Sequence, residues 1–169
     1  MPTENEKKYV LSPSFNAEGL AGWSIEQIEQ GYPDKGVRIR RSNDSYYHTY
    51  KKWVPSANRL VELEGDINVR DFEDLKTVCP DMLIKTRYTK EVGEEEWVVD
   101  FLKTKSGQVY FVMSEVEMPE GVEDPKEILP EIKDSIVWYV EKNDPRFTNK
   151  ELMNQEHAKQ MYKMMGVDI

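Results

Sequence analysis

Charged residues recur at every second position in several stretches of the chain. The clearest examples are Arg38-Ile39-Arg40, Glu62-Leu63-Glu64, Lys85-Thr86-Arg87 and Glu115-Val116-Glu117. A β-strand sends alternate side chains to opposite faces, so the two charged residues of each example share one face. Val, Ile, Leu, Tyr and Trp lie between and around them and favour strands. The pattern therefore predicts a sheet with a charged face.

The same alternation predicts eight strands. They span residues 4–11, 25–32, 36–42, 45–53, 59–67, 82–90, 95–103 and 108–118. Charges of both signs on many strands suggest a sheet wrapped around a polar interior, and about eight strands enclose room for one small ligand. The predicted fold class is α+β, an eight-stranded antiparallel closed barrel, or tunnel, with helices packed outside and a C-terminal helix.

Helical spacing predicts the elements outside this sheet. Apolar residues repeat at helical intervals in residues 68–79, before Pro80, and a short helix is expected within residues 124–134. The last helix is expected from Thr148, which stands three residues before Glu151 as in a capping box, to Gly166. Its apolar stripe is expected to pack on the outside of the sheet. Because no linker or repeat divides the chain, residues 1–169 are interpreted as one domain.

The overall charge and the cysteine content narrow the class of protein. The 169 residues carry a formal net charge of −9, which argues against a nucleic-acid partner bound through its phosphate backbone. No run of 18 apolar residues predicts a membrane span, and the first residues lack the apolar stretch of a signal peptide. The single cysteine, Cys79, fits a reducing compartment, so a cytoplasmic location is expected.

Residues of the charged parity form the candidate site. The cations are Lys8, Arg38, Arg40, Lys51, Lys85 and Arg87, and the carboxylates are Glu4, Glu6, Glu62, Glu64, Asp100, Glu115 and Glu117. Any single pair is more often the solvent face of an amphipathic sheet. Recurrence over many strands favours a ligand instead. Carboxylates suit Mg²⁺ or Mn²⁺ and the basic residues suit phosphate, so a metal-bound polyphosphate would use both sets.

Eight segments in order resemble those of one family. Glu4-x-Glu6-x-Lys8 resembles the ExExK signature of the CYTH superfamily, the triphosphate tunnel metalloenzymes. The likeness continues through Ile28-Glu29-Gln30-Gly31-Tyr32 with Val37-Arg38-Ile39-Arg40, Thr49-Tyr50-Lys51, Glu62-Leu63-Glu64, Ile84-Lys85-Thr86-Arg87-Tyr88, Trp97-Val98-Val99-Asp100, Ser114-Glu115-Val116-Glu117 and Asp144-Pro145-Arg146-Phe147-Thr148-Asn149. It covers nearly the whole chain and is nearest to the bacterial inorganic triphosphatase branch. Asn5 departs from the family, in which an apolar residue separates the two glutamates.

The resemblance implies a tunnel that binds a triphosphate with Mg²⁺ or Mn²⁺, and it assigns roles to the charged residues. Glu4, Glu6, Glu115 and Glu117 correspond to metal ligands, and Asp100 to a metal ligand or a partner of a basic residue. Glu62 and Glu64 correspond to catalytic residues that support a second metal or orient water, with Lys85 as the third catalytic residue. The phosphate-binding residues are Lys8, Arg38, Arg40, Lys51, Lys85 and Arg87.

The expected function is metal-dependent hydrolysis of a phosphoanhydride in a small triphosphate. Inorganic tripolyphosphate is the first choice of substrate, followed by thiamine triphosphate or a nucleoside triphosphate. Two alternatives stay open: a class IV-type adenylyl cyclase that makes cyclic AMP from ATP, and a non-catalytic nucleotide or polyphosphate binding protein. A homodimer is also left open. So is the role of Arg146, which would either reach the tunnel mouth or hold the final helix.

Overall fold

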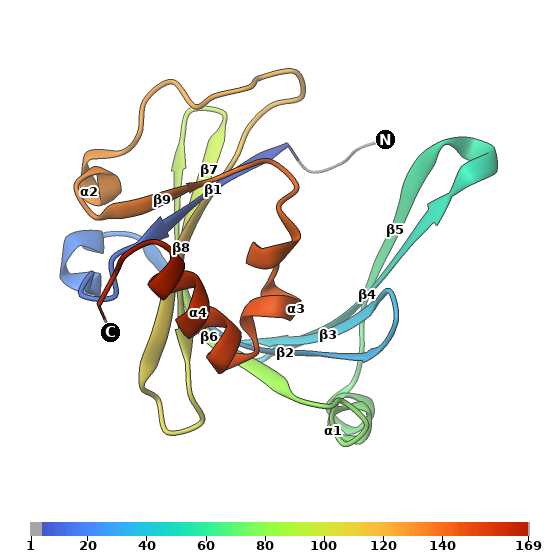
Figure 1. Ribbon diagram of the computed structural model, residues 1–169. Coiled ribbons are helices and arrows are strands. Elements are labelled where there is room, and N and C mark those ends of the chain that lie inside the picture. Colours follow the sequence, from blue (N-terminus) through green and yellow to red (C-terminus); the bar gives the residue numbers. More distant parts are fainter. Residues whose placement is uncertain (1–4, 169) are drawn as a thin grey trace. The chain divides into compact units, whose positions relative to one another are not determined.

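All eight stretches with the charged alternation form strands in the computed structural model, which describes residues 5–168 (Figure 1). The strands are β1 (Glu6–Leu11), β2 (Ser24–Asp34), β3 (Val37–Ser42), β4 (Ser45–Val54), β5 (Arg59–Asp66), β6 (Met82–Val92), β7 (Glu95–Lys103) and β8 (Val109–Glu117). A ninth strand, β9 (Ile136–Val140), was not predicted. Its five residues are all apolar or aromatic, so no alternation marks it as a strand.

The strands follow one another in an open order. Hydrogen bonding places them as β5-β4-β3-β2-β6-β7-β8-β1-β9, and the pairings described residue by residue are antiparallel. The α+β class and a mostly antiparallel sheet are therefore confirmed. The two ends of the order, β5 and β9, are not neighbours in it, so hydrogen bonds among the described strands do not close the sheet. The predicted closed barrel is not confirmed, because the unpredicted β9 pairs with the edge of β1 that β8 leaves free.

The described residues form two compact units. The first unit comprises residues 26–84, and the second unit comprises residues 5–25 and 85–168. Both β2 and β6 contribute residues to each unit, because the divisions at Ile25/Glu26 and Ile84/Lys85 fall inside these strands. The interpretation of residues 1–169 as a single domain stays a prediction.

In the first unit, helix α1 (Val69–Lys76) packs beside the apolar face of the sheet. The helix begins as the spacing predicts, with the Asn68 side chain accepting a hydrogen bond from the Asp71 N–H at 2.8 Å. Its buried Phe72 meets the ring of Tyr46, with the two centroids 5.1 Å apart. A one-turn helix, η2 (Pro55–Ala57), links β4 to β5. Ile39 of β3 lies on the apolar face, so Arg38 and Arg40 on either side of it point to the opposite face.

The second unit has a hydrophobic core on one face of its sheet. Tyr9 and Leu11 of β1, Trp97, Val99 and Phe101 of β7, and Val112 and Val116 of β8 form this core. Leu20 of η1 (Ala17–Leu20) and Ile132 of α2 (Pro130–Lys133) cover it. The helix predicted within residues 124–134 is only one turn long, because Pro130 occupies its first turn and cannot extend it backwards.

The predicted C-terminal helix is interrupted. After η3 (Pro145–Phe147), the chain forms α3 (Asn149–Leu152) and α4 (Gln155–Met164) instead of one helix. Thr148 caps α3 as predicted, accepting from the Glu151 N–H at 3.3 Å. Asn154 then accepts from the His157 N–H at 3.1 Å and starts a second helix, since a side-chain cap competes with continued helical bonding.

These C-terminal helices lie against the charged side of the sheet, not against its apolar core. The Tyr162 ring of α4 packs on Phe111 of β8, with centroids 4.8 Å apart. Phe111, Met113 and Glu115 stand at every second position of β8, so all three point to the same face. The expectation that the final helix packs outside is therefore wrong. Helix α4 covers the end of the charged face at which the residues of that face are apolar.

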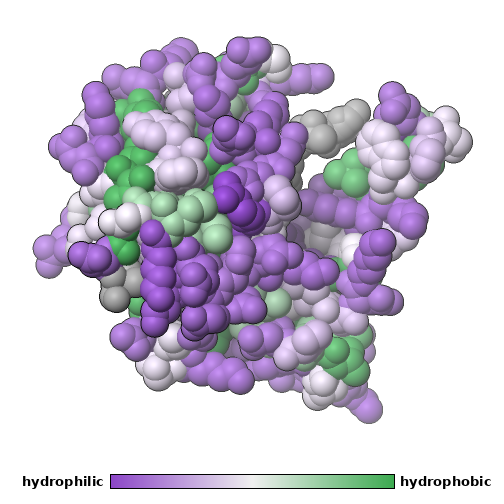
Figure 2. Space-filling view, viewed as in Figure 1, coloured by the Kyte–Doolittle hydropathy of each residue, from purple (hydrophilic) through white to green (hydrophobic). Residues whose placement is uncertain are grey.

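The face of the molecule seen in Figure 2 is mostly polar. In Figure 2 hydrophilic side chains cover most of the viewed face, in keeping with a charged content of 33%. No helix within residues 5–168 is both long enough and apolar enough to span a membrane.

We predict that Tyr162→Phe lowers the free energy of unfolding by about 1–3 kcal/mol. The buried Tyr162 hydroxyl donates to the Leu11 carbonyl at 2.8 Å and accepts from the Val112 N–H at 3.1 Å, so its loss leaves two backbone groups unpaired. Urea unfolding measures the change. Tyr139→Phe, at an exposed position, is the matched control and should have little effect. Equal effects of the two variants would contradict this role for the hydroxyl.

Candidate functional site

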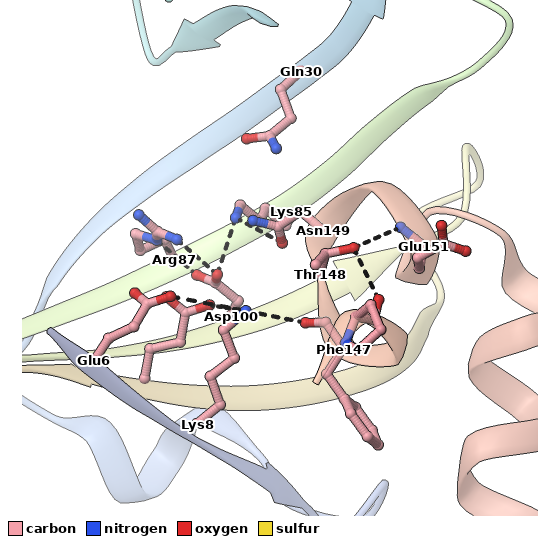
Figure 3. A network of polar contacts seen from close by, with 12 residues as sticks. Glu6, Lys8, Gln30, Lys85, Arg87, Asp100, Phe147, Thr148, Asn149 and Glu151 are labelled. Carbon is pink, nitrogen blue, oxygen red and sulfur yellow. Dashed lines mark hydrogen bonds and ion pairs between the residues drawn. The ribbon is translucent and has the colours of Figure 1, made fainter. Parts of the chain in front are cut away.

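A buried carboxylate joins two cations in the second unit (Figure 3). The Asp100 side chain on β7 accepts from Lys85 Nζ at 3.0 Å. It also accepts from Arg87 through two parallel bonds, Nε to Oδ1 and Nη2 to Oδ2, both at 2.8 Å. The side chains of Asp100 and Lys85 are 1% and 0% exposed, so water does not screen their charges. Asp100 therefore serves as the partner of two basic residues, the second of the two roles that its sequence position suggests.

The charges around Asp100 control its protonation. Burial alone would raise the pKa of this carboxyl, because a charged group loses its hydration in the protein interior. The nearby charges of Lys85 and Arg87, with their hydrogen bonds, outweigh burial and lower the pKa below its ordinary value. Asp100 is therefore ionised at neutral pH, and the three groups together carry one net positive charge.

Carboxylates lie near Lys8 on its own strand and on β8. Lys8 of β1 lies opposite Glu115 of β8 in the strand register, and Glu6 lies opposite Glu117. Cross-strand neighbours point to the same face, so all four side chains share the face that carries Asp100, which lies opposite Met113. Lys8 Nζ is 3.9 Å from Glu6 Oε1 and 4.0 Å from Glu115 Oε1. These distances allow attraction but are too long for hydrogen bonds.

The C-terminal segment supplies two further acceptors. The Phe147 carbonyl accepts from Lys8 Nζ at 3.2 Å, and Asn149 Oδ1 accepts from Lys85 Nζ at 3.4 Å (Figure 3). The buried Phe147 ring anchors this segment. Sequence reasoning assigned no role to Asn149. The available signal was its place as the last residue of the Asp144–Asn149 segment that resembles the family.

Arg146 holds the final helix. Its guanidinium donates to the Asp144 carboxylate, with Nη2 2.7 Å from Oδ2, and Nη1 lies 3.0 Å from Met164 Sδ. The hydrogen bond from Arg146 lowers the pKa of Asp144. The Arg146 carbonyl is 2.8 Å from Nε2 of His157. These contacts tie η3 to α4 and favour the second of the two roles considered for Arg146.

A pocket of about 330 Å³ opens beside Lys8. It is lined by Glu6, Lys7 and Lys8 of β1, by residues 140–145 and by Thr148. Lys8 therefore borders open space on one side and the Phe147 carbonyl on the other. Such a pocket is large enough for a small anionic group.

In the first unit, the predicted charged residues of β3, β4 and β5 share one face. Arg38 lies opposite Thr49, and Thr49 lies opposite Glu64. Arg38 Nη2 donates to Thr49 Oγ1 at 3.2 Å, and Thr49 Oγ1 lies 3.4 Å from Glu64 Oε2. Arg38 Nε is buried and has no hydrogen-bond partner among the described residues. A buried donor without an acceptor is costly, and a bound anion would supply one.

Two more predicted residues of the first unit, Lys51 and Arg40, contact side chains of neighbouring strands. Lys51 Nζ is 3.8 Å from Glu62 Oε2 and both side chains are more than a third exposed, so this pair contributes little to stability. Arg40 Nε donates to Gln30 Oε1 at 2.9 Å. Gln30 is another residue that sequence reasoning gave no role, although it stands inside the Ile28–Tyr32 segment.

The structure thus groups the predicted residues within each unit. The second unit contains Glu6, Lys8, Lys85, Arg87, Asp100, Glu115 and Glu117, and the first unit contains Arg38, Arg40, Lys51, Glu62 and Glu64. Glu4 lies outside the described residues. Within residues 5–168, no three Asp, Glu, His or Cys side chains converge on a point where one metal ion could bind. Among the described residues, the predicted metal ligands Glu6, Glu115 and Glu117 lie on adjacent strands and on one face of the sheet.

Comparison with solved structures shows a shared fold. The hypothetical protein NE1496 matches with a TM-score of 0.58 and 22% identity, over 89% of this chain and 97% of that one. A conserved hypothetical protein of Pyrococcus furiosus matches at 0.49 and 14% identity, over 98% and 92%. A Bacillus halodurans protein named "putative adenylate cyclase" matches at 0.47 and 11% identity, over 98% and 90%. The TM-score of 0.58 shows a common fold with NE1496, and an identity of 22% supports no conclusion about activity.

Comparisons of the sequence itself identify no relative. No family model matches the chain. No curated protein matches it either.

We predict that Asp100→Asn lowers the free energy of unfolding by roughly 3–5 kcal/mol near neutral pH, because it leaves Lys85 buried without its counter-charge. The folded pKa of Asp100 lies below its unfolded value of about 4, so its stabilisation is complete above that pH. It is lost as pH falls through the lowered folded pKa. The gap between wild type and variant should therefore narrow in acid.

Urea unfolding between neutral pH and about pH 3 tests this prediction. Asp168→Asn, at an exposed position of the same unit, is the matched control and should change stability little at any pH. A gap that stays constant as the pH falls would show that Asp100 does not stabilise the fold through its charge.

Proposed function

We propose that this protein is a metal-dependent triphosphatase that cleaves a phosphoanhydride of a small triphosphate, with inorganic tripolyphosphate as the first substrate to test. The observation that carries the proposal is the Asp100 cluster. Lys85 and Arg87 both donate to the Asp100 carboxylate, and these three groups together carry one net positive charge in a buried setting. A preorganised cationic group of this kind suits the phosphate oxygens of a multiply charged ligand.

Phosphoryl transfer mainly needs positioning and neutralisation of charge. Lys8, Lys85 and Arg87 of the second unit, and Arg38, Arg40 and Lys51 of the first, are the proposed phosphate-binding residues. Arg38 Nε supports this assignment, since it is buried and has no acceptor within residues 5–168. The resemblance of the chain to the CYTH superfamily supports it as well, because these positions match the basic positions of the family motifs.

The proposed metal is Mg²⁺ or Mn²⁺. The chemistry of the donors fits either ion, because Glu6, Glu115 and Glu117 lie on one face of adjacent strands. When bound, such an ion would offset phosphate charge and favour attack by water. Glu4 is proposed as a further ligand from the family motif. Asp100 is not included, because both of its oxygens are engaged by Lys85 and Arg87.

Glu62 and Glu64 are the proposed residues that orient the attacking water, and Lys85 is the proposed catalytic cation. Water adds to the terminal phosphorus, the bridging P–O bond breaks, and a proton passes to solvent. Tripolyphosphate would yield orthophosphate and pyrophosphate. The cation set would stabilise the charge that develops on the leaving pyrophosphate.

Phosphate release from tripolyphosphate, thiamine triphosphate and ATP, each with Mg²⁺, with Mn²⁺ and with chelator, tests the proposal. We expect release from tripolyphosphate that depends on metal. Separation of the ATP products distinguishes ADP and phosphate from cyclic AMP and pyrophosphate. Cyclic AMP would favour the cyclase alternative, and the absence of turnover with all three compounds would overturn the enzyme proposal.

We further predict that Glu115→Gln lowers the rate of tripolyphosphate hydrolysis roughly 100-fold or more while tripolyphosphate still binds. Glu115 is a proposed metal ligand that lies opposite Lys8, and its amide replacement removes the charge but keeps the shape. Steady-state hydrolysis and calorimetric binding measure the two effects. Glu123→Gln, at an exposed position of the same unit, is the matched control. If hydrolysis persists in Glu115→Gln at the wild-type rate, the assigned role of Glu115 is wrong.

A further inference from the structure

Arg40 is oriented by a buried side chain that carries no charge. Its Nε donates to Gln30 Oε1 at 2.9 Å, and the Gln30 side chain is fully buried. The two residues lie directly opposite each other on β2 and β3. The contact is therefore built into the strand pairing and does not depend on a mobile surface side chain.

Gln30 is itself held from its other end. Its Nε2 donates to the Tyr32 hydroxyl at 3.0 Å, two residues further along the same face of β2. Burial raises the pKa of Tyr32, so this hydroxyl stays neutral at physiological pH. The Arg40 guanidinium has donors and no acceptor, so the end of the amide that meets it must be the oxygen, and the nitrogen is then the end that donates to the Tyr32 hydroxyl.

The choice of an amide has an electrostatic consequence. In the second unit a carboxylate positions Lys85 and Arg87, and it cancels one of their two charges. An amide oxygen accepts the same kind of hydrogen bond but adds no negative charge. Gln30 can therefore set the direction of the Arg40 guanidinium without weakening its attraction for an anion.

We propose that Gln30 is a positioning residue for phosphate binding, which orients Arg40 through a neutral hydrogen bond and so preserves its attraction for the triphosphate. This inference rests on the proposed function. Glutamate is nearly equal to glutamine in size. In the variant Gln30→Glu it would keep the bond to Arg40, but its negative charge would repel the anionic ligand. This substitution should lower the affinity for the anion more than it lowers the stability of the fold.

The decisive comparison is between Gln30→Glu and Gln27→Glu. Both variants add one negative charge to β2, but Gln27 is exposed and has the opposite parity, so it points to the other face. We expect Gln30→Glu to raise KM for tripolyphosphate about tenfold with a smaller change in kcat, as expected when one charge-assisted contact to the ligand is weakened. Gln27→Glu should change KM less than about twofold, the effect of a distant, screened charge.

Thermal unfolding of the same variants separates positioning from a structural role. Gln30→Leu removes the acceptor and leaves Arg40 Nε and the Tyr32 hydroxyl without this partner, so it should lose both stability and affinity. Gln30→Glu keeps an acceptor for Arg40 and should recover stability relative to Gln30→Leu without recovering affinity. If affinity simply follows stability across the variants, Gln30 is structural and the inference is wrong.

Tyr32→Phe supplies the test if Gln30→Glu does not fold. It frees the other end of the amide while leaving every charge unchanged, and we expect KM to rise a few-fold, about the size of one neutral hydrogen bond. An unchanged KM would count against the inference. If the wild-type protein hydrolyses tripolyphosphate but Gln30→Glu and Gln27→Glu have the same KM, the inference is wrong and the proposed function is unaffected. A wild-type protein that neither binds nor cleaves tripolyphosphate overturns the proposed function and the inference with it.

Discussion

The Asp100 carboxylate lies buried between Lys85 and Arg87, and the charged face of the second unit depends on this interaction. A lysine with no exposed side-chain surface would lose its charge or destabilise the fold without a partner. Asp100 supplies Lys85 with a partner of opposite charge, and the three groups Asp100, Lys85 and Arg87 together keep one positive charge. The same pairing explains why Asp100 is a poor candidate for metal coordination. Both of its oxygens already accept from cations.

The C-terminal segment belongs to the same charged face. The Phe147 carbonyl meets Lys8, Asn149 meets Lys85, and Tyr162 packs on Phe111 further along β8. One face of this sheet therefore changes along its length from charged residues to an apolar patch covered by α4. The opposite face is the hydrophobic core under η1 and α2. The Arg146 contacts to Asp144 and Met164 help to keep the segment in this position.

Much of the strand pattern could be predicted because alternation reports directly on which side chains share a face. Arg38, Thr49 and Glu64 are brought together by the register, as are Lys8 and Glu115. Strand β9 escaped prediction because a short, wholly apolar run has no alternation. The interruption at Asn154 was missed because the apolar stripe of Ala158, Met161, Tyr162 and Met165 lies wholly after it and carries no sign of a break. Gln30 and Asn149 were missed because neutral amides have no chemistry of their own that would mark them as site residues.

The amino-acid sequence by itself determined eight strands, the parity of their charged residues, the cap at Thr148, and the candidate cations and carboxylates. These features depend on neighbours within a few residues, so local order is enough to define them. Only the tertiary structure decided that Asp100 pairs with Lys85 and Arg87, that β9 joins β1, and that the final helices cover the charged side of the sheet. Those outcomes depend on residues far apart in the chain, whose contacts arise from packing and from the need to pair each buried charge.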